Sequence, residues 1–456
     1  MSATSHQEPW LRPEAASYEA VNTVVSAPLI GAVKLGSRPW RRWWIAFFCA
    51  LPFALLFVTG FAVSTTQGIG VWGNNTTIVW GFDIANYVWW IGIGNAGTLI
   101  SALLLLTRQA WRSSINRFAE AMTLFAAAIA GLFPIFHLGR PVFAYWLAPY
   151  PNPMALWPQW RSALVWDFWA IGSYLLFSLL FWYTGLLPDL ATLRDRARRP
   201  LTRRLYGVFA LGWRGSAQQW AHHQSFYKVM AGLAVPLVCS VHSIVGLDFA
   251  ASLMPGWEES LFPPYFVVGA MFSGFAMVVL IAALIRWGLG LDALITPRHF
   301  DAMAKVLLAG SCVMALSYAT EWFTAWFSGD RAERGYLAYA WTGRYAGVYG
   351  LMLLFNCVLP QALWSRRVRR SLPALAMIAA CVLVGMWFER VLIIWNTLGR
   401  GHLPSLWAAF HPRFWDWAVL FGSIGAFACM FLVFVRVVPA VSLFEMRELA
   451  DEEHPA

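Results

Sequence analysis

Charged residues are scarce in this chain: they make up 12% of its 456 residues, whereas 59% of the residues are hydrophobic. A soluble domain contains roughly 25% charged residues. The shortage therefore excludes a soluble globular protein and indicates a polytopic membrane protein. The 28 tryptophans agree with this class, because indole rings favour the boundary between lipid headgroups and acyl chains.

The chain also lacks the cysteine motifs of metal centres. Its six cysteines all lie inside apolar runs, with neither CxxC nor CxxCH spacing. This pattern argues against an iron–sulfur cluster, a zinc site or a c-type haem in this chain, and we expect no metal site. A b-type haem needs two facing histidines, and only His137 and His242 fall in the predicted spans, so one haem is conceivable but a two-haem relay is excluded.

No apolar stretch opens the given sequence, so we expect no cleavable signal peptide. We predict a cytoplasmic N-terminal tail over residues 1–42. With about 20 apolar residues per crossing, the rest of the chain predicts ten transmembrane helices and an all-α fold. The predicted spans are 43–63, 84–106, 118–138, 163–186, 227–247, 265–287, 302–327, 345–364, 373–394 and 414–437.

The basic residues predict the orientation of these spans. With an even number of spans, 25 of the 33 Lys and Arg residues fall on the side of the termini. The positive-inside rule then places both termini in the cytoplasm. The longest connection, 188–225, is rich in arginine and is interpreted as a surface helix that contacts lipid headgroups or, alternatively, a partner subunit.

A weak internal repeat predicts how the spans are grouped. Residues 117–122 (RFAEAM) open the third span and residues 298–303 (RHFDAM) open the seventh. The offset of four spans predicts two four-helix bundles, spans 2–5 and spans 6–9, with spans 1 and 10 at the periphery. The corresponding regions are 43–247 for span 1 and the first bundle, 248–394 for the second bundle, and 395–456 for the tenth span and a cytoplasmic C-terminal tail.

Polar side chains interrupt the apolar segments between residues 82 and 167. A charge near mid-bilayer without a partner costs on the order of 2 to 3 kcal/mol, so each such residue is a functional candidate. The alternating direction of the spans brings several of them, and others from later spans, to one layer near the outer face. The residues in question are Asp83, Asn95, Glu120, His137, Arg140, Asp167, His242 and Asp248.

A histidine and a carboxylate that meet near the outer face suit quinol chemistry. A quinol that is oxidised releases two electrons and two protons; an imidazole can accept one proton at neutral pH and a carboxylate the other. We therefore predict His137 and Asp167 as proton acceptors. Asp248, Asn95, Asp83 and Arg140 are predicted to line the quinol site, whereas His242 is interpreted as a structural hydrogen bond between helices.

Carboxylates also lie near the membrane faces in both predicted bundles. Glu120 and Asp301 occupy matching positions near the cytoplasmic side, and Glu321 lies toward the outer side. They are candidates for a proton path, since such relays are built from carboxylates. Ion pairing is the other interpretation: Glu120 and Asp301 with Arg117, Arg298 or Lys228, and outer-end ion pairs for Glu321, for Asp416 and for Glu389 with Arg390.

Several long motifs resemble those of a known family. The chain is similar to the polysulfide-reductase (NrfD-like) membrane subunits, most closely to the larger quinol-oxidising subunit of bacterial alternative complex III. The similarity covers nearly everything after the N-terminal tail. The motifs are residues 68–75, 80–83, 89–101, 136–141, 263–266 and 444–447.

The resemblance implies a fold, a substrate and partners. It implies two four-helix bundles without haem and a menaquinol or ubiquinol site near the outer face, in which His137 and Asp167 match the quinol-contacting pair and Asp248 a nearby carboxylate. It also implies an iron–sulfur subunit docked outside, c-type cytochrome subunits, a homologous NrfD-like membrane subunit and a terminal cytochrome c oxidase, all at a bacterial inner membrane. Relatives often have histidine at Asn95, and because an amide does not titrate, Asn95 argues against a proton relay there.

Three other functions fit parts of the pattern. The chain resembles shorter subunits that reduce quinone in polysulfide or nitrite reductase complexes. Repeated bundles with buried carboxylates also fit a secondary transporter, although transporter sites usually break helices near mid-membrane. A passive membrane anchor would need none of the polar residues. The basic residues are spread between apolar spans and form no soluble basic face, so nucleic acid is not an expected partner.

Overall fold

The structure, a computed structural model, describes residues 9–15, 17, 19–21, 25 and 38–453, and this part of the chain contains helices and no strand. Most of the predicted tail 1–42 lies outside the described residues. Within the described residues, ten helices are long and apolar enough to cross a membrane, which confirms the predicted number. The spans are α2 (Arg38–Gln67), α3 (Gly81–Leu106), α4 (Asn116–Ala130) with α5 (Phe133–His137), α6 (Ala163–Arg196), α8 (Ala217–Ala250), α9 (Phe262–Leu289), α10 (Pro297–Ser328), α12 (Ala346–Leu353) with the turns up to Trp364, α14 (Leu372–Gly399) and α15 (Phe414–Val437).

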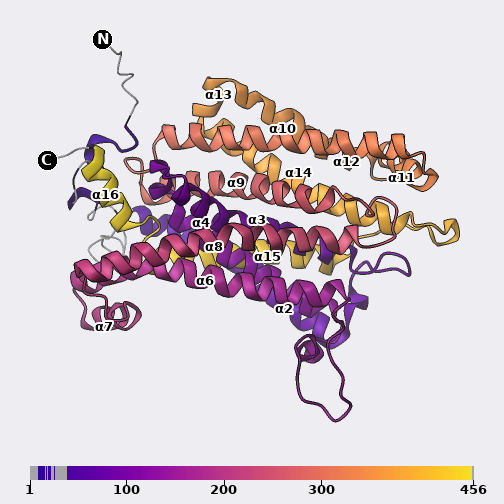
Figure 1. The fold of residues 1–456 in the computed structure, drawn as a ribbon, viewed down its shortest axis with the longest axis horizontal. Helices are drawn as coiled ribbons and strands as arrows, with labels where there is room; N and C mark the ends of the chain where they lie inside the picture. Colours follow the sequence, from indigo (N-terminus) through magenta and orange to yellow (C-terminus); the bar gives the residue numbers. More distant parts are fainter. Residues whose placement is uncertain (1–8, 16, 18, 22–24, 26–37, 454–456) are drawn as a thin grey trace.

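The long helices run side by side, and both described ends of the chain lie at the same end of the helix stack (Figure 1). The backbone N–H groups of Trp10 and Leu11 donate to the Glu453 carboxylate at 2.8 and 3.0 Å, which joins the N-terminal segment to α16 (Leu443–Glu453). We call this end the terminal side. The opposite end, where α11 (Arg331–Thr342) lies, is the far side. The assignment of the terminal side to the cytoplasm stays a prediction.

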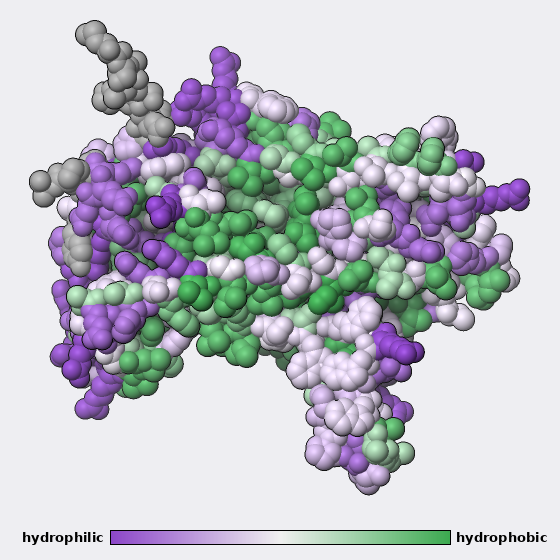
Figure 2. All heavy atoms as spheres, in the orientation of Figure 1, coloured by the Kyte–Doolittle hydropathy of each residue, from purple (hydrophilic) through white to green (hydrophobic). Residues whose placement is uncertain are grey.

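On the face shown in Figure 2, an apolar belt crosses the middle of the molecule between two more polar ends. The first span, α2, contributes much of this apolar surface. Only 11% of its most apolar 18-residue stretch is buried inside the protein, and the side chains of Ile45, Phe48 and Val58 are exposed. In water such a surface would be unfavourable, because apolar area is stabilised by removal from water. Acyl chains are therefore the natural surroundings of this belt.

The helices pack in two rings that share an interface. In the first ring α3 contacts α4 and α8, and α6 contacts α4 and α8; in the second, α9, α10, α12 and α14 pack together. However, α9 and α14 also pack against α3, and α2 packs chiefly against α15. The predicted division into two separate bundles stays a prediction, because α3 contacts members of both rings.

Small residues allow the helices around α3 to approach closely, as the glycines of residues 92–97 predict. A Cβ atom at Gly97 would lie 2.0 Å from the Ala119 carbonyl oxygen of α4. A Cβ atom at Gly274 of α9 would lie 1.8 Å from the Ala96 Cβ atom. Close backbone approach through small residues is typical of membrane helix pairs, where van der Waals packing drives association.

The connection predicted over 188–225 contains a helix, as expected, but it is shorter than predicted because both flanking spans extend into it. Helix α6 continues to Arg196, a separate helix α7 covers Pro200–Phe209, and α8 begins at Ala217. The apolar run ends near Leu187, but Leu190 and Leu193 are buried against residues of α7. Packing beyond the apolar run therefore extends α6 past the predicted span end, despite Pro188 in its interior.

Candidate functional site

Three helices bring Tyr87, Asp167 and Asp248 together near the far side. Tyr87 lies on α3, Asp167 near the start of α6 and Asp248 near the end of α8. The Asp167 carboxyl lies close enough to the Asp248 carboxyl and to the Tyr87 side chain to interact electrostatically with both. Two carboxylate anions at short range repel each other, so such a pair favours a bound proton. The sequence predicted that Asp167 and Asp248 lie in one layer, and the structure places them close together.

The two carboxyl groups are shielded from solvent but not saturated with partners. Asp167 is 8% exposed, and one oxygen of each of Asp167 and Asp248 has no hydrogen-bond partner among the described residues. Buried polar atoms are nearly always paired in proteins, so such atoms indicate a ligand, a water or a catalytic role. The pair therefore retains two acceptor positions that a ligand hydroxyl could use.

Asp83 extends this group by one helical turn. It lies four residues before Tyr87 on α3, so the two side chains project from the same face of the helix. Asp83 is 1% exposed, and neither of its carboxyl oxygens has a partner among the described residues. Asp83, Tyr87, Asp167 and Asp248 together are called the far-side group below. It contains no basic side chain from the described residues.

Two other predicted site residues, His137 and Arg140, lie in the segment between α4 and α6. His137 is the last residue of α5, which packs against α3 and α6, the helices that carry Tyr87 and Asp167. The His137 side chain lies outside the part of the chain that the structure describes, so its predicted contact with Asp167 stays a prediction. Arg140 follows α5 and is exposed at the start of the short helix η4 (Pro141–Leu147).

Asn95 lies deeper than the far-side group. It is eight residues beyond Tyr87 on α3, about 12 Å along the helix axis. Its amide contacts the His242 imidazole of α8, and both residues are buried. The contact agrees with the interpretation of His242 as a hydrogen-bonding link between helices. It separates Asn95 from the carboxyl groups with which the sequence grouped it.

A second buried polar cluster lies among α10, α12 and α14. The predicted ion pair of Glu389 with Arg390 is present at 3.0 Å, and both residues are buried. The Tyr318 hydroxyl donates to the Glu389 carboxylate, and the Asn356 amide donates to the Tyr318 hydroxyl at 3.0 Å. The Arg390 guanidinium also lies 4.1 Å from the centre of the Phe266 ring. These contacts satisfy the charges inside the protein and indicate a structural role.

The predicted ion pairs of Asp416 and Glu321 are wrong for the described residues. The Asp416 carboxylate caps its own helix α15, because it accepts hydrogen bonds from the backbone N–H groups of Gly73 at 2.8 Å and Arg413 at 2.7 Å. Glu321 is half-buried and forms no ion pair with a described cation; the charges that act on it come from other carboxylates, Glu259 first. In the far-side loop, burial and the charge of Glu333 raise the pKa of Glu259 to about 7.

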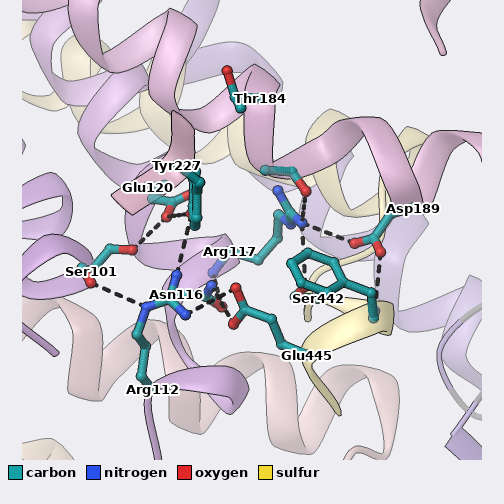
Figure 3. Close-up of polar contacts among 12 residues, drawn as sticks. Ser101, Arg112, Asn116, Arg117, Glu120, Thr184, Asp189, Tyr227, Ser442 and Glu445 are labelled. Atoms are coloured by element: carbon teal, nitrogen blue, oxygen red, sulfur yellow. Dashed lines mark hydrogen bonds and ion pairs between the residues drawn. The ribbon is translucent and has the colours of Figure 1, made fainter. Parts of the chain in front are cut away.

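The terminal side contains a dense network of paired charges (Figure 3). Arg117 forms a buried ion pair with Asp189 of α6 at 2.9 Å and donates to the Gly185 carbonyl at 2.7 Å. Asp189 also accepts from the backbone N–H groups of Leu443 and Phe444 at 3.1 and 3.2 Å. Since these N–H groups open α16, the same carboxylate that neutralises Arg117 caps the C-terminal helix.

A second ion pair continues this network. Arg112 pairs with Glu445 of α16 at 2.9 Å, and the Arg112 guanidinium also donates to the Tyr227 hydroxyl at 3.3 Å. Burial lowers the pKa of Arg112, but the charge of Glu445 and its neighbours raises it by more, so Arg112 stays cationic. Arg112, Arg117, Glu120, Asp189, Tyr227 and Glu445 are called the terminal-side network below.

The predicted pairing of Glu120 with Arg117 is wrong, because Arg117 forms its ion pair with Asp189. Glu120 instead accepts hydrogen bonds from the Ser101 hydroxyl and the Tyr227 hydroxyl at 2.5 and 2.9 Å. Its second carboxyl oxygen is buried without a partner among the described residues. Of the three carboxylates predicted for a proton path, Glu120 is the most deeply buried, at 1% exposure.

Asp301 does not share the surroundings of Glu120, although the repeat predicted matching positions. It is paired with Lys305 at 2.7 Å and with Arg369 at 2.8 Å. Arg298, one of its predicted partners, lies instead over the Trp10 ring at 3.7 Å. The prediction that Asp301 is paired is confirmed, but with other cations.

Some residues of these sites were not predicted. Tyr87 was missed because a tyrosine is ordinary in a span, although its position one turn after Asp83 was a usable signal. Asp189 was assigned to a loop, and its partner Arg117 is 72 residues away in the chain. Glu445 lies in a C-terminal segment for which no contact was predicted. Long-range pairs of this kind have no local signature.

Comparison with known proteins relates the chain to subunits of reductases. Residues 70–399 match the sequence profile of the family described as "Polysulphide reductase, NrfD". A protein of Halobacterium salinarum, named as a membrane subunit of a dimethyl sulfoxide reductase, is 27% identical over 236 residues, 51% of this chain and 50% of that protein. A protein of Mesobacillus selenatarsenatis, named as a subunit of selenate reductase, is 21% identical over 442 residues, 86% of this chain and 93% of that protein.

This chain aligns with different fractions of the two relatives. The chain spans about half the length of the Halobacterium relative and nearly all of the Mesobacillus relative. The family profile includes Asp83, Asp167 and Asp248 within its matched residues and extends over most of the helices. On this match, the chain belongs to the polysulphide reductase, NrfD, family of membrane subunits.

Proposed function

We propose that the chain is the membrane subunit of a quinol-oxidising complex, and that the far-side group, together with His137, receives the protons of a bound quinol. The observation that supports this most directly is the proximity of Asp167 and Asp248. Two neighbouring carboxyl groups can bind a proton between them, and each of these two retains an oxygen without a partner among the described residues.

The chemistry balances with the residues at hand. A quinol that is oxidised to a quinone loses two electrons and two protons. One hydroxyl proton passes to the Asp167–Asp248 pair, next to which Tyr87 lies and interacts electrostatically. The other passes to the imidazole of His137, which is basic enough at neutral pH. The two electrons leave to an iron–sulfur cluster in a partner subunit docked on the far side.

The names of the relatives support the direction of electron flow. A dimethyl sulfoxide reductase and a selenate reductase both consume electrons, so these relatives fit a role as electron donors to the rest of their complexes. A menaquinol or ubiquinol dissolved in the bilayer is a suitable electron source. In the alternative complex III that the sequence resembles, the electrons would continue to c-type cytochromes and a terminal oxidase. Isolation of the intact complex would identify the partners, because haem c spectra distinguish the two assemblies.

Orientation and proton translocation belong to the same proposal. The excess of arginine and lysine on the terminal side supports cytoplasmic termini, hence a far side outside the cytoplasm, at the inner membrane of a bacterium. Of the residues predicted for a proton path, Asp301 is held by two cations, whereas Glu120 retains an oxygen without a partner among the described residues. Glu120, with Glu321 on the far side, therefore remains the candidate for a coupled proton path.

Substitution of the carboxyl pair tests the proposal. We expect Asp167→Asn and Asp248→Asn each to lower quinol-dependent turnover of the intact complex about 100-fold or more, since a positioned proton acceptor contributes roughly 10²–10⁴-fold. The matched control is Asp301→Asn, a carboxylate of the same chain that lies outside the far-side group. Wild-type turnover in both variants would contradict the proposal and favour a passive anchor. Substrate uptake by vesicles without quinol would favour a transporter.

A further inference from the structure

Helix α7 presents an apolar face that nothing in the described chain covers. Leu201, Leu205, Val208 and Phe209 repeat at the spacing of one helical face and are 69%, 52%, 70% and 55% exposed. Leu211, just after the helix, is 69% exposed. Helix α7 has ten residues, so these four exposed side chains are most of its apolar residues. A surface of this kind is stable in water only if a membrane or a partner covers it.

Arginines flank this apolar face. Arg198 and Arg199 precede the helix, and Arg203 and Arg204 lie within it; all four are exposed. Residues 197–216 contain no Asp or Glu. The neighbouring Arg194 and Arg196 are already paired with Asp195 and Glu19, whereas no carboxylate of the described residues forms an ion pair with the four flanking arginines. The platform formed by α7 and these arginines therefore has a positive charge that the described chain leaves unneutralised.

The platform is held firmly to the membrane-spanning helices. The Tyr206 hydroxyl donates to the Val437 carbonyl at the end of α15 at 2.9 Å, and the Tyr183 hydroxyl of α6 donates to the Phe209 carbonyl at 2.6 Å. The Arg194 guanidinium donates to the Trp213 carbonyl at 2.9 Å. Tyr206 is buried on the face of α7 that turns toward α6. These contacts fix which face of α7 is exposed.

The position of α7 matches the edge of the apolar belt. Figure 1 shows α7 at the terminal side, displaced sideways from the ends of α6 and α8. On α8, the apolar side chains of Phe226, Val229 and Leu233 are also exposed. The leucine face of α7 thus belongs at the level where acyl chains meet headgroups, which suits an amphipathic helix lying in the interface plane.

We propose that the α7 platform is a binding site for anionic phospholipid in the leaflet on the terminal side. The exposed leucines and Phe209 insert among acyl chains, and Arg198, Arg199, Arg203 and Arg204 donate hydrogen bonds to the phosphates. Charge complementarity selects an anionic lipid over a zwitterionic one, because a basic residue near an anionic membrane surface adds about fivefold to binding. The site is separate from the far-side group and does not depend on the quinol chemistry.

Lipid titration of the purified full-length chain tests this site. Native mass spectrometry from a neutral detergent counts bound lipid as phosphatidylglycerol or phosphatidylcholine is added. We expect the wild type to bind the first phosphatidylglycerol at least tenfold more tightly than phosphatidylcholine. The triple variant R199Q/R203Q/R204Q should lose that preference, with a loss of roughly 100-fold at about fivefold per charge.

Two further variants keep the test decisive. R199K/R203K/R204K retains the charges and should bind phosphatidylglycerol within a few-fold of the wild type, since lysine still binds phosphate as a point charge. L201S/L205S should weaken both lipids and retain the preference between them. Equal binding of the two lipids by the wild type would overturn the proposal and leave α7 as a docking surface for an acidic protein. Undiminished phosphatidylglycerol binding by a folded R199Q/R203Q/R204Q variant would overturn it as well.

Discussion

Helix α6 buries one aspartate near each end, and the two have opposite surroundings. Asp189, on the terminal side, is paired with Arg117 at 2.9 Å and accepts two backbone hydrogen bonds from the start of α16. Asp167, about 33 Å away along the helix, faces Asp248 and Tyr87, with no described cation among its contacts. Burial alone therefore does not distinguish a structural carboxylate from a reactive one. The identity of the partner does.

The difference has a chemical meaning. A carboxylate paired with arginine stays ionised and stabilises the fold only while the pair is intact. A carboxylate that faces another carboxylate must hold a proton between them and can exchange it with a ligand. The terminal-side network is thus expected to be needed for folding and the far-side group for turnover.

The largest expected effect is on stability, from the terminal-side network. Arg117→Met leaves Asp189 buried without its cation, which should lower the free energy of unfolding by about 3–5 kcal/mol. Thermal denaturation of the purified protein in detergent measures this change. The double variant R117M/D189L should recover much of the loss, because it removes both charges. If the single variant melts like the wild type, the network is not structural.

The next largest effect is on turnover, from His137. His137→Ala should lower quinol-dependent turnover about 100-fold, as expected for the loss of a positioned proton acceptor. His242→Ala is the matched control: His242 contacts Asn95 deeper in the protein, so a fall of less than about tenfold is expected there. Steady-state assays of the intact complex separate the two variants. If His137→Ala and His242→Ala lower turnover equally, His137 has no special role in quinol oxidation compared with the deeper Asn95–His242 contact.

A smaller effect is expected from Tyr87, which belongs to the far-side group without titrating. Tyr87→Phe removes the hydroxyl that interacts with Asp167, and one hydrogen-bonding group contributes about 0.5–1.5 kcal/mol. A loss of roughly tenfold in kcat/KM is expected, with the melting temperature nearly unchanged. A shifted pH profile of turnover would show that Tyr87 acts through the carboxyl pair. An unchanged profile together with unchanged kinetics would exclude Tyr87 from the site.

The smallest effect concerns Glu259, a carboxyl close to another carboxylate but outside the spans. Burial and the charge of Glu333 raise the pKa of Glu259 to about 7 from 4.5. The folded state therefore binds this proton more tightly than the unfolded state, so its contribution is complete below pH 4.5 and is lost as the pH rises toward about 7. Glu259→Gln should flatten the dependence of the melting temperature on pH in this window, whereas Glu258→Gln should not. A wild-type protein whose melting temperature rises from pH 5 to pH 7 in parallel with the Glu259→Gln variant would contradict this.

The sequence predicted the number of spans because hydropathy depends only on local composition. It also predicted that Asp167 and Asp248 lie in one layer, since the alternating direction of spans fixes depth. It failed where contacts between distant residues decide the outcome. One interpretation paired Arg117 with Glu120, three residues away, whereas Asp189 of another helix forms the ion pair with Arg117. Asp301 likewise pairs with Arg369, from a segment 68 residues later.

The residues at which helices end also could not be predicted from amino-acid composition. The apolar run of α6 stops near Leu187, but the helix continues to Arg196 because buried leucines and Asp189 contact α7 and α16 there. Depth along a span can be predicted from a sequence. Which side chains meet at that depth depends on helix rotation, and the sequence pattern specifies this only weakly.

Infrared difference spectroscopy of quinol oxidation by the intact complex tests the role of Asp167 and Asp248 most directly, because the C=O stretch of a protonated carboxyl group reports proton uptake. The expected result is a carboxylic acid band that appears when quinol is oxidised, disappears in Asp167→Asn and in Asp248→Asn, and persists in Glu259→Gln. A band of wild-type intensity in both asparagine variants would contradict the assignment of the quinol protons to this pair.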